Sequence, residues 1–307
     1  MAESILIHRL RFHSGLRCGS LAGDVNRQLD FVPGSTLMGG LATCASRVNG
    51  PEAVAELVRS LRLSSLLWLK DGQVYVPRPP LAAVRMEAES RKRIKAWNWI
   101  PLPAVASFVR KGVLPEGEPP VLFEEEGTTS VALDRMTNAA VPFPRKRLRP
   151  LPGVEGLVVG MVPEPLVPLF EGALSVLGDT GIGGERSTGW GHFSPVVYEG
   201  PGAEGLRSSL AGGSDLYMTL GAFVPRREEV PSIETAAEKN PSTCWSLWRL
   251  RGFVGESSDI LKPTVTCLAH GSVLPFRPEG EVLDITPEGA PNPVLFNGRP
   301  PAIAVPA

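Results

Sequence analysis

The sequence predicts an α+β fold made of two ferredoxin-like (RRM-like) βαββαβ units, the first of which carries an insertion. Within the first 199 residues the predicted elements follow the order strand, helix, strand, strand, helix, strand. A Gly- and Ser-rich stretch, 200–214, indicates a linker. The remaining residues, 215–307, are rich in strand patterns. The 307 residues are enough for one large domain or two ordinary ones.

The first unit, 1–199, contains clear periodic patterns. Apolar residues alternate in the first strand, and Ser35 is the predicted N-cap of the helix that follows. The Asp71-Gly72 pair indicates a turn between two strands. In chain order the predicted elements are a strand (5–12), two helices (35–48 and 51–61), the turn-linked strands (62–69 and 73–81), two strands (129–133 and 154–162), a helix (163–178) and a closing strand (190–199).

Residues 85–127 interrupt this pattern. They are first charged, then aromatic, then Pro-rich, and contain one short predicted helix, 103–111. We therefore predict an insertion here. Its basic run, which includes Arg93 and Lys95, precedes Trp97 and Trp99. These residues form either an RNA-binding surface with stacking tryptophans or a solvated helix face above a core.

Four strand-like stretches make up the second unit, with one weak helical pattern inside 226–240. They span 215–225, 244–254, 264–274 and 293–306. The two halves of the chain also differ in charge. Residues 1–150 hold 21 Lys and Arg against 14 Asp and Glu, whereas 151–307 hold 10 against 18. A basic half and an acidic half suit different partners.

Six glycines lie in the sixteen residues "GDTGIGGERSTGWGHF", 178–193. The glycines permit positive φ and close approach of another backbone, and neighbouring N–H groups in such a loop can bind an anion. Arg186 is suited to a forked contact with phosphate, and Trp190 offers a flat face for a base. A tight helix-to-strand turn with a core tryptophan is the alternative.

The spacing excludes two nucleotide-binding motifs. Gly181 and Gly183 would require a glycine at position 186 to form Gly-x-Gly-x-x-Gly, and the loop follows a helix instead of a strand. The phosphate-binding P-loop requires a lysine that this stretch lacks. There is also no metal-ligand cluster and no nucleophile beside a base. We therefore expect no catalytic residue, metal or cofactor.

Other features concern location. The four cysteines are scattered without a Cys-x-x-Cys pair, which suits small buried thiols in a reducing compartment. No apolar run reaches the length of a membrane span, and the start has no basic region followed by an apolar one. We therefore expect a cytoplasmic protein without membrane contact.

The stretch "LGDTGIGGERSTGWGHF" strongly resembles the glycine-rich loop of the RAMP superfamily of CRISPR subunits. Three further stretches, "FVPGSTLMGGLATCA", "LRLSSLLWLKDGQVYVPRPPL" and "SVALDRMTNAAVPF", resemble the fourth Csm subunit of type III-A effector complexes. Strands of the second half, "LYMTLGAFVP", "WRLRGFVGES" and "AHGSVL", are similar to that subunit's second domain. The resemblance covers about residues 5–275, and the order of the motifs carries it.

The resemblance implies a non-catalytic RNA-binding scaffold for antiviral defence. Such subunits hold the repeat-derived 5′ handle of the guide RNA (crRNA), contact target RNA, and lie beside the large polymerase-like subunit and a backbone RAMP subunit. The insertion at 85–127 would be a hairpin-like thumb that kinks the guide–target duplex. The implied RNA-binding residues are Arg17, Ser35, Arg93, Lys95, Arg135, Thr137, Asn138, Gly181, Ile182, Gly183, Gly184, Arg186, Ser187, Thr188 and Trp190.

Three alternatives stay open within this superfamily. Some relatives are metal-independent RNA-processing endonucleases that use a histidine near the first helix, for which His13 is the candidate. Other relatives cleave target RNA with an aspartate, for which Asp24 and Asp30 are candidates, although Asp30 is better suited to ordering the turn before the helix. The third alternative is the equivalent handle-binding subunit of a type III-B (Cmr) complex.

Overall fold

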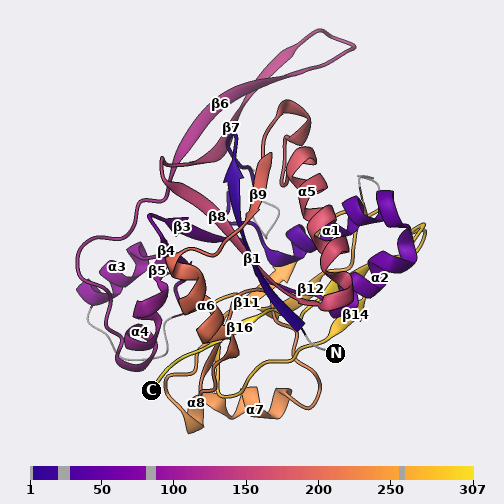
Figure 1. Ribbon diagram of the computed structural model, residues 1–307. Helices are drawn as coiled ribbons and strands as arrows, with labels where there is room; N and C mark the ends of the chain where they lie inside the picture. The colour runs from indigo at the N-terminus through magenta and orange to yellow at the C-terminus, as the bar shows by residue number, and fades with distance from the viewer. Residues whose placement is uncertain (1–2, 20–27, 81–87, 256–259) are drawn as a thin grey trace.

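A computed structural model describes residues 3–19, 28–80, 88–255 and 260–307 (Figure 1). It confirms a mixed α and β fold with antiparallel sheets. No helix in the described residues is long and apolar enough to cross a bilayer. The candidate Asp24 lies outside the described residues.

One seven-stranded antiparallel sheet forms the centre of the molecule, in the order β5-β4-β3-β8-β1-β9 with β2 paired to β8. Strands β1 and β8 pair over eight residues, from Glu3 opposite Pro163 to Leu10 opposite Gly156. Most side chains of β8 are buried, and in β1 those of Ile7, His8 and Leu10 are, because helices pack on the sheet. The strands are β1 (Glu3–Phe12), β2 (Arg62–Leu63), β3 (Leu67–Lys70), β4 (Gln73–Pro77), β5 (Trp99–Pro101), β8 (Val154–Pro163) and β9 (Phe193–Val197).

Helices α1 (Gly34–Asn49), α2 (Pro51–Ser60) and α5 (Val167–Thr180) pack together, with η2 (Glu164–Leu166) leading into α5 (Figure 1). A Cβ on Gly40 would lie 2.8 Å from a methyl of Leu177, so this glycine lets α1 approach α5 closely. The prediction that Ser35 caps α1 is wrong. Pro33 is the N-cap residue, and the Ser65 hydroxyl, distant in sequence, accepts a bond from the Gly34 N–H at 3.2 Å.

The predicted insertion, 85–127, contains short helices and the beginning of a hairpin. Its described part contains α3 (Ala88–Ala96), β5, η1 (Leu102–Ala104) and α4 (Val105–Lys111). A long hairpin begins at the end of this range, made of β6 (Phe123–Leu133) and β7 (Ala140–Pro150), which pair with each other over eleven positions. Among the described residues its one further backbone bridge joins Leu148 to Leu16. This β6–β7 hairpin projects from the body of the molecule (Figure 1). The stretch 129–133, predicted as a strand of the first unit, therefore belongs to the projection.

The stretch 200–214, predicted as a linker, is mostly helix α6 (Pro201–Ala211). Its Ala203, Leu206 and Leu210 are buried against the sheets, so helical spacing of three apolar residues outweighs the local glycine and serine content. The second half otherwise consists of short elements. They are β10 (Tyr217–Thr219), α7 (Val230–Glu234), α8 (Ala236–Lys239), β11 (Leu247–Leu250), β12 (Val265–Leu268), β13 (Val273–Leu274), β14 (Val282–Asp284), β15 (Leu295–Asn297) and β16 (Ala302–Ala304).

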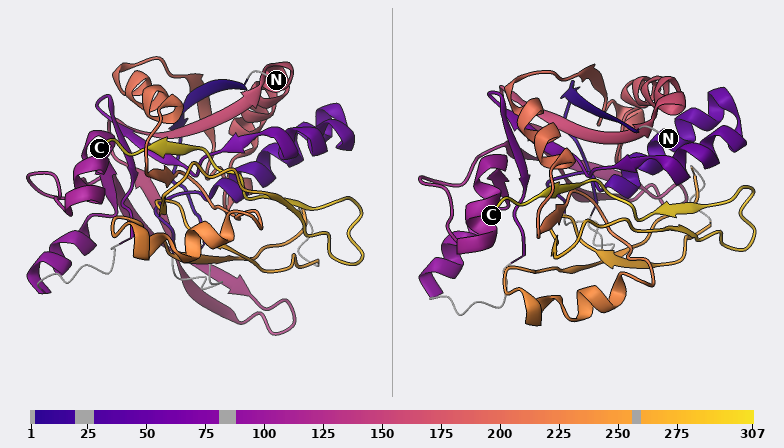
Figure 2. Two further views of the ribbon diagram at one scale, coloured as in Figure 1. Left: turned by 90° about the horizontal axis from the view of Figure 1, so that it is seen from below. Right: turned by 60° about the horizontal axis from the view of Figure 1, so that its bottom comes forward.

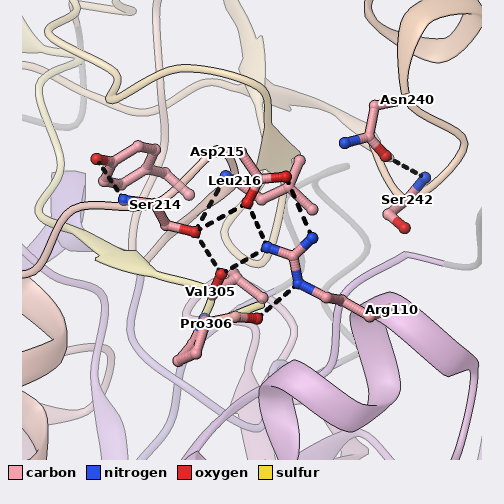
Figure 3. A network of polar contacts seen from close by, with 9 residues as sticks. Arg110, Ser214, Asp215, Leu216, Asn240, Ser242, Val305 and Pro306 are labelled. Atoms are coloured by element: carbon pink, nitrogen blue, oxygen red, sulfur yellow. Dashed lines mark hydrogen bonds and ion pairs between the residues drawn. The ribbon is translucent and has the colours of Figure 1, made fainter.

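The two halves share one core. Buried Leu216, Met218 and Ile303 of the second half belong to the same apolar cluster as Ile7 and Val159 of the main sheet. A polar network adds to this junction (Figure 3). In it Arg110 of α4 pairs with Asp215 and donates hydrogen bonds to the carbonyls of Val305 and Pro306. The hydrogen bond from Arg110 lowers the pKa of the Asp215 carboxyl.

Candidate nucleic-acid interface

The glycine loop between α5 and β9 is held by backbone hydrogen bonds to other parts of the chain. The N–H of Ile182 donates to the carbonyl of Gly191 at 3.0 Å, and the N–H of Gly184 donates to the carbonyl of Arg17 at 2.8 Å. The N–H of Gly191 donates to the carbonyl of Gly15 at 3.0 Å. The predicted row of N–H groups open to an anion is therefore largely used inside the protein.

At two positions of the loop, Gly183 and Gly191, a side chain larger than that of glycine does not fit. Gly183 has φ +88, and a Cβ there would lie 2.2 Å from the carbonyl oxygen of Arg17. Gly191 has φ +72, and its Cβ would lie 1.9 Å from the carbonyl oxygen of Ile182. Both positions thus require a left-handed backbone and close approach of another chain segment, which the sequence predicts for Gly183. Ile182 is 3% exposed and belongs to the core, so its side chain is not a contact surface.

The tip of the loop is open to solvent. Residues Arg186, Ser187 and Thr188 form the short helix η3 (Arg186–Thr188) and are exposed. The ring of His192 hydrogen bonds through Nε2 to the carbonyl of Arg186 at 3.1 Å, which supports this turn from beneath. The predicted exposed arginine is therefore present, on a loop whose backbone is held by hydrogen bonds.

A groove of about 540 Å³ runs beside the loop. Its walls are the glycine loop, one side of α1, and Gly252, Phe253, Gly255 and Lys262. Its described lining contains four cationic residues and no Asp or Glu. Burial of Lys262 removes its ammonium partly from water and thereby lowers its pKa. The cationic residues are Arg17, Arg47, Arg186 and Lys262. A groove of this charge favours an anionic ligand.

Much of the groove wall is bare backbone. Gly39 of α1 faces the groove, and a Cβ there would meet nothing within 4 Å. Gly181, Gly183 and Gly184 line the opposite wall. Small residues on both walls let a ligand backbone approach closely.

Glu185 joins three segments at one end of the loop. Its carboxylate accepts a hydrogen bond from Arg17 at 2.9 Å and also pairs with Arg145 of β7. Glu185 adopts φ +65, a conformation that non-glycine residues rarely take. The side chains of all three residues are about one-quarter exposed or less, so the ion pairs are partly shielded from water.

Trp190 is half-buried, and the base of the β6–β7 hairpin covers one face of its ring. The guanidinium of Arg147 lies 4.8 Å from the ring centroid of Trp190. The same arginine packs on Gly15, where a Cβ would lie 2.6 Å from its Cδ. The predicted stacking surface on Trp190 is therefore limited to its other face.

The remaining predicted RNA-binding residues lie in three places. Ser35 lies in the first turn of α1 and is not among the residues that line the groove, whereas its neighbour Thr36 is. Arg135, Thr137 and Asn138 form the exposed tip of the β6–β7 hairpin, where the Thr137 hydroxyl donates to Asp134 at 2.8 Å.

Arg93 and Lys95 are exposed on α3, which lies at the β5 side of the molecule, away from α1 and α2 (Figures 1 and 2). The structure does not bring these two residues to the groove. Trp97 and Trp99 are 3% and 4% exposed, so they are core residues, which agrees with the second of the two alternatives and not with stacking tryptophans.

Several residues of this site escaped sequence reasoning. Gly39, Phe253 and Lys262 line the groove, and Glu185 pairs with Arg17. Of these only Gly39 carried a local signal, since adjacent glycines inside a helix cost stability and call for a packing or functional reason.

The described candidate catalytic residues, His13 and Asp30, both make hydrogen bonds to other side chains of the chain. His13 is exposed, and its Nε2 lies 2.9 Å from the Ser194 hydroxyl. Asp30 accepts hydrogen bonds on its carboxylate from Trp99 at 3.0 Å and Asn98 at 3.3 Å, which fits the predicted ordering of the turn before α1. Burial raises the pKa of Asp30. Within the described residues no group of three His, Cys, Asp or Glu could hold a metal ion.

Three comparisons place the chain among known proteins. Residues 213–305 match the family model of the CRISPR Csm4 C-terminal domain. The chain is 28% identical to the CRISPR system Cms protein Csm4 of Thermococcus onnurineus (strain NA1), over 82% of this chain and 84% of that protein. It is also 28% identical to Csm4 of Mycobacterium tuberculosis (strain CDC 1551 / Oshkosh), over 89% and 90%.

Solved structures share the fold. One is the Csm3-Csm4 subcomplex of the type III-A CRISPR-Cas interference complex, with TM-score 0.65 at 15% identity over 97% of this chain and 98% of that one. Another is the Csm1-Csm4 cassette in complex with pppApA, with TM-score 0.63 at 18% identity over 98% of both chains. Together with the family match over residues 213–305, these likenesses confirm the resemblance found in the sequence: the chain is similar to Csm4 proteins over most of its length and shares the fold of solved Csm4 structures.

Proposed function

We propose that the chain is a non-catalytic RNA-binding scaffold of a type III-A CRISPR complex, and that it holds the 5′ handle of the guide RNA in the groove beside the glycine loop. The observation that carries this proposal is the groove itself. Its described lining combines Arg17, Arg47, Arg186 and Lys262 with bare glycine walls and contains no acidic residue.

The dimensions and chemistry of the groove suit an unpaired strand. Proteins grip single-stranded RNA through its phosphates and its 2′-hydroxyls. The cationic side chains supply the phosphate contacts, and exposed Ser187 and Thr188 supply hydroxyls at the loop tip. The locked backbone beneath them limits the entropy lost when RNA binds, because the loop is already ordered.

Strand pairing supports two ferredoxin-like units. In the first half the path β9-β1-β8-β3 gives the order 4-1-3-2 for the four strands of a βαββαβ unit, and β4 and β5 extend one edge. In the second half β16 pairs β10, β10 pairs β13, and the single bridge Cys244–Val273 continues toward β11. This is the same order, with the β14–β15 hairpin in place of the second helix.

The partners follow from the solved neighbours. Those structures contain Csm4 with Csm3 in one case and with Csm1 in the other. We infer that this chain contacts a backbone RAMP subunit and the large polymerase-like subunit in the same way. Residues 151–307 hold 18 Asp and Glu against 10 Lys and Arg, and outside the groove this acidic excess leaves surface available to these proteins. The projecting β6–β7 hairpin, not the insertion before it, is then the segment positioned to reach target RNA.

A substitution in the groove wall tests handle binding. Gly39→Glu places a carboxylate in the groove, where a side chain has room, so the protein should fold while its affinity for handle RNA falls about tenfold at moderate salt. Gly172→Glu in α5 is the matched control, since it also replaces a helical glycine with open space around it, but outside the groove. Filter binding measures both.

Equal RNA affinity of Gly39→Glu and the wild-type chain would contradict the groove as the binding site. The non-catalytic part is tested separately. Incubation with repeat RNA without metal should leave the RNA intact, and cleavage that disappears in His13→Ala would favour a processing endonuclease instead.

A further inference from the structure

A second hollow of about 290 Å³ opens directly from the groove. The two share lining residues Thr36, Gly39, Gly252, Phe253 and Lys262, so a strand in the groove passes the mouth of the hollow. Its volume lies at the lower end of small-molecule sites, which begin at about 300 Å³. A space of this size suits a single aromatic ring system better than a whole nucleotide.

The floor of the hollow is apolar. Met38 and Ala42 of α1, Leu250 of β11, Val265 of β12 and Phe296 of β15 line it. These residues come from both halves of the chain, so the hollow exists only where the halves meet. An apolar floor excludes phosphate and ribose, which prefer water or charged partners, and accepts a flat base.

The mouth carries groups of a different kind. Phe253 is 52% exposed there, and Arg251 and Lys262 stand beside it. The side-chain hydroxyls of Ser35 and Thr36, also at the hollow, make no hydrogen bond to another residue of the described chain. An aromatic ring between cations is the arrangement that stacks a base while it holds the adjoining phosphates.

We propose that this hollow is a nucleobase pocket, which takes one base turned out of the RNA strand that lies in the groove. This inference rests on the proposed handle binding. The floor offers stacking and apolar contact with few hydrogen-bonding groups. The pocket therefore accepts any base, and binding depends on whether a base is present and not on which base it is. An apolar side chain of a protein partner is the competing occupant.

An abasic scan of the handle RNA tests the pocket on the full-length chain. Each nucleotide of the host repeat's 5′ handle is replaced in turn by an abasic residue, and the affinity is measured. One position should lose roughly tenfold in affinity, as expected for a lost stacked base. Exchange of that base for another base should change affinity much less.

Two protein variants connect that position to the pocket. Ala42→Leu fills the floor, and it should weaken binding of intact RNA roughly tenfold while it removes the sensitivity to the abasic residue. Ala96→Leu on α3 is the control, as an exposed alanine outside both hollows. Because Ala42 packs partly against the core, Phe253→Leu at the exposed mouth serves as a second variant that should fold and lose affinity at the same nucleotide.

The outcomes separate the two proposals. If Gly39→Glu weakens RNA binding but the abasic scan is flat, or if Ala42→Leu and Phe253→Leu bind RNA as the wild type does, the groove stands and the base pocket is overturned. Weaker co-purification of a protein partner with unchanged RNA affinity would assign the hollow to that partner and also overturn the pocket. Failure of the wild-type chain to bind handle RNA would overturn both.

Discussion

The glycine loop and the β6–β7 hairpin differ in how firmly the rest of the chain holds them, and in each case the local sequence and structure suggest the opposite. The loop is rich in glycine, yet the N–H groups of Ile182, Gly184 and Gly191 all donate to backbone carbonyls of the surrounding chain. The hairpin has eleven paired positions of regular strand, yet in the described part of the chain its strands make only one backbone bridge outside the hairpin, between Leu148 and Leu16. Local regularity therefore does not measure how firmly a segment is held. Burial and contacts with the body do.

In the described residues, the contacts of the hairpin with the body come from the part between its base and its middle. Leu148 and Leu16 exchange backbone hydrogen bonds of 2.7 and 2.9 Å, and Arg145 and Arg147 contact the glycine loop. Toward the tip, Leu133 is 69% exposed and Met136 is 94% exposed. Such a projection contributes little apolar burial to the fold, so its sequence is available for contacts with partners.

The largest expected effect tests the locked state of the loop. Gly191→Ala forces a Cβ into the carbonyl of Ile182 at a positive φ, and should lower the free energy of unfolding by about 3 kcal/mol. Thermal unfolding measures this loss. Gly189→Ala is the control, because Gly189 has φ +87 with open space around it, and only backbone strain of about 1 kcal/mol should remain. Equal losses for both variants would mean that the loop yields, and the contrast with the hairpin would disappear.

Sequence periodicity predicted the elements that bury a repeating apolar face. The first strand, the helices around α1 and α2 and the helix before the glycine loop all appear near their predicted positions. The hairpin was missed because β7 carries Pro142 and Pro144 and shows no apolar alternation, and because it is stabilised by pairing across the turn at Asp134. Such pairing joins residues that are far apart along the chain, so no pattern within a short stretch of sequence predicts it.

The sequence likewise predicted those parts of the site that lie close together along the chain, and not those that folding brings together. The glycines and Arg186 lie within one short stretch, and their chemistry could be inferred from it. Gly39 and Lys262 reach the groove only because α1 and the second half fold against the loop. Conversely, the basic run at Arg93 and Lys95 looked favourable in sequence but lies on a different side of the molecule (Figure 2). Charge alone does not say which cations meet.

A smaller effect tests the connection between loop and hairpin. Glu185→Gln removes the carboxylate that pairs with Arg17 and Arg145, and should cost about 1 kcal/mol because these pairs are partly shielded. Amide hydrogen exchange should rise in β7 and stay unchanged in the glycine loop, which keeps its backbone bonds. Glu125→Gln is the control, since its pair with Lys146 is half-exposed and should contribute almost nothing. Faster exchange in the loop itself would show that Glu185 holds both regions.

The smallest effect lies at the hairpin tip. The carboxylate of Asp134 accepts hydrogen bonds from the Met136 N–H and the Thr137 hydroxyl at 2.8 Å each, and these bonds lower its pKa. Its contribution is therefore present above the unfolded-state value of 3.8 and is lost as the pH falls through the lower folded-state value. Asp134→Ala should speed amide exchange at 134–139 and leave the melting temperature of the chain unchanged, because the tip buries so little. A fall in melting temperature would show that the tip is coupled to the core, and the hairpin would then be as firmly held as the loop.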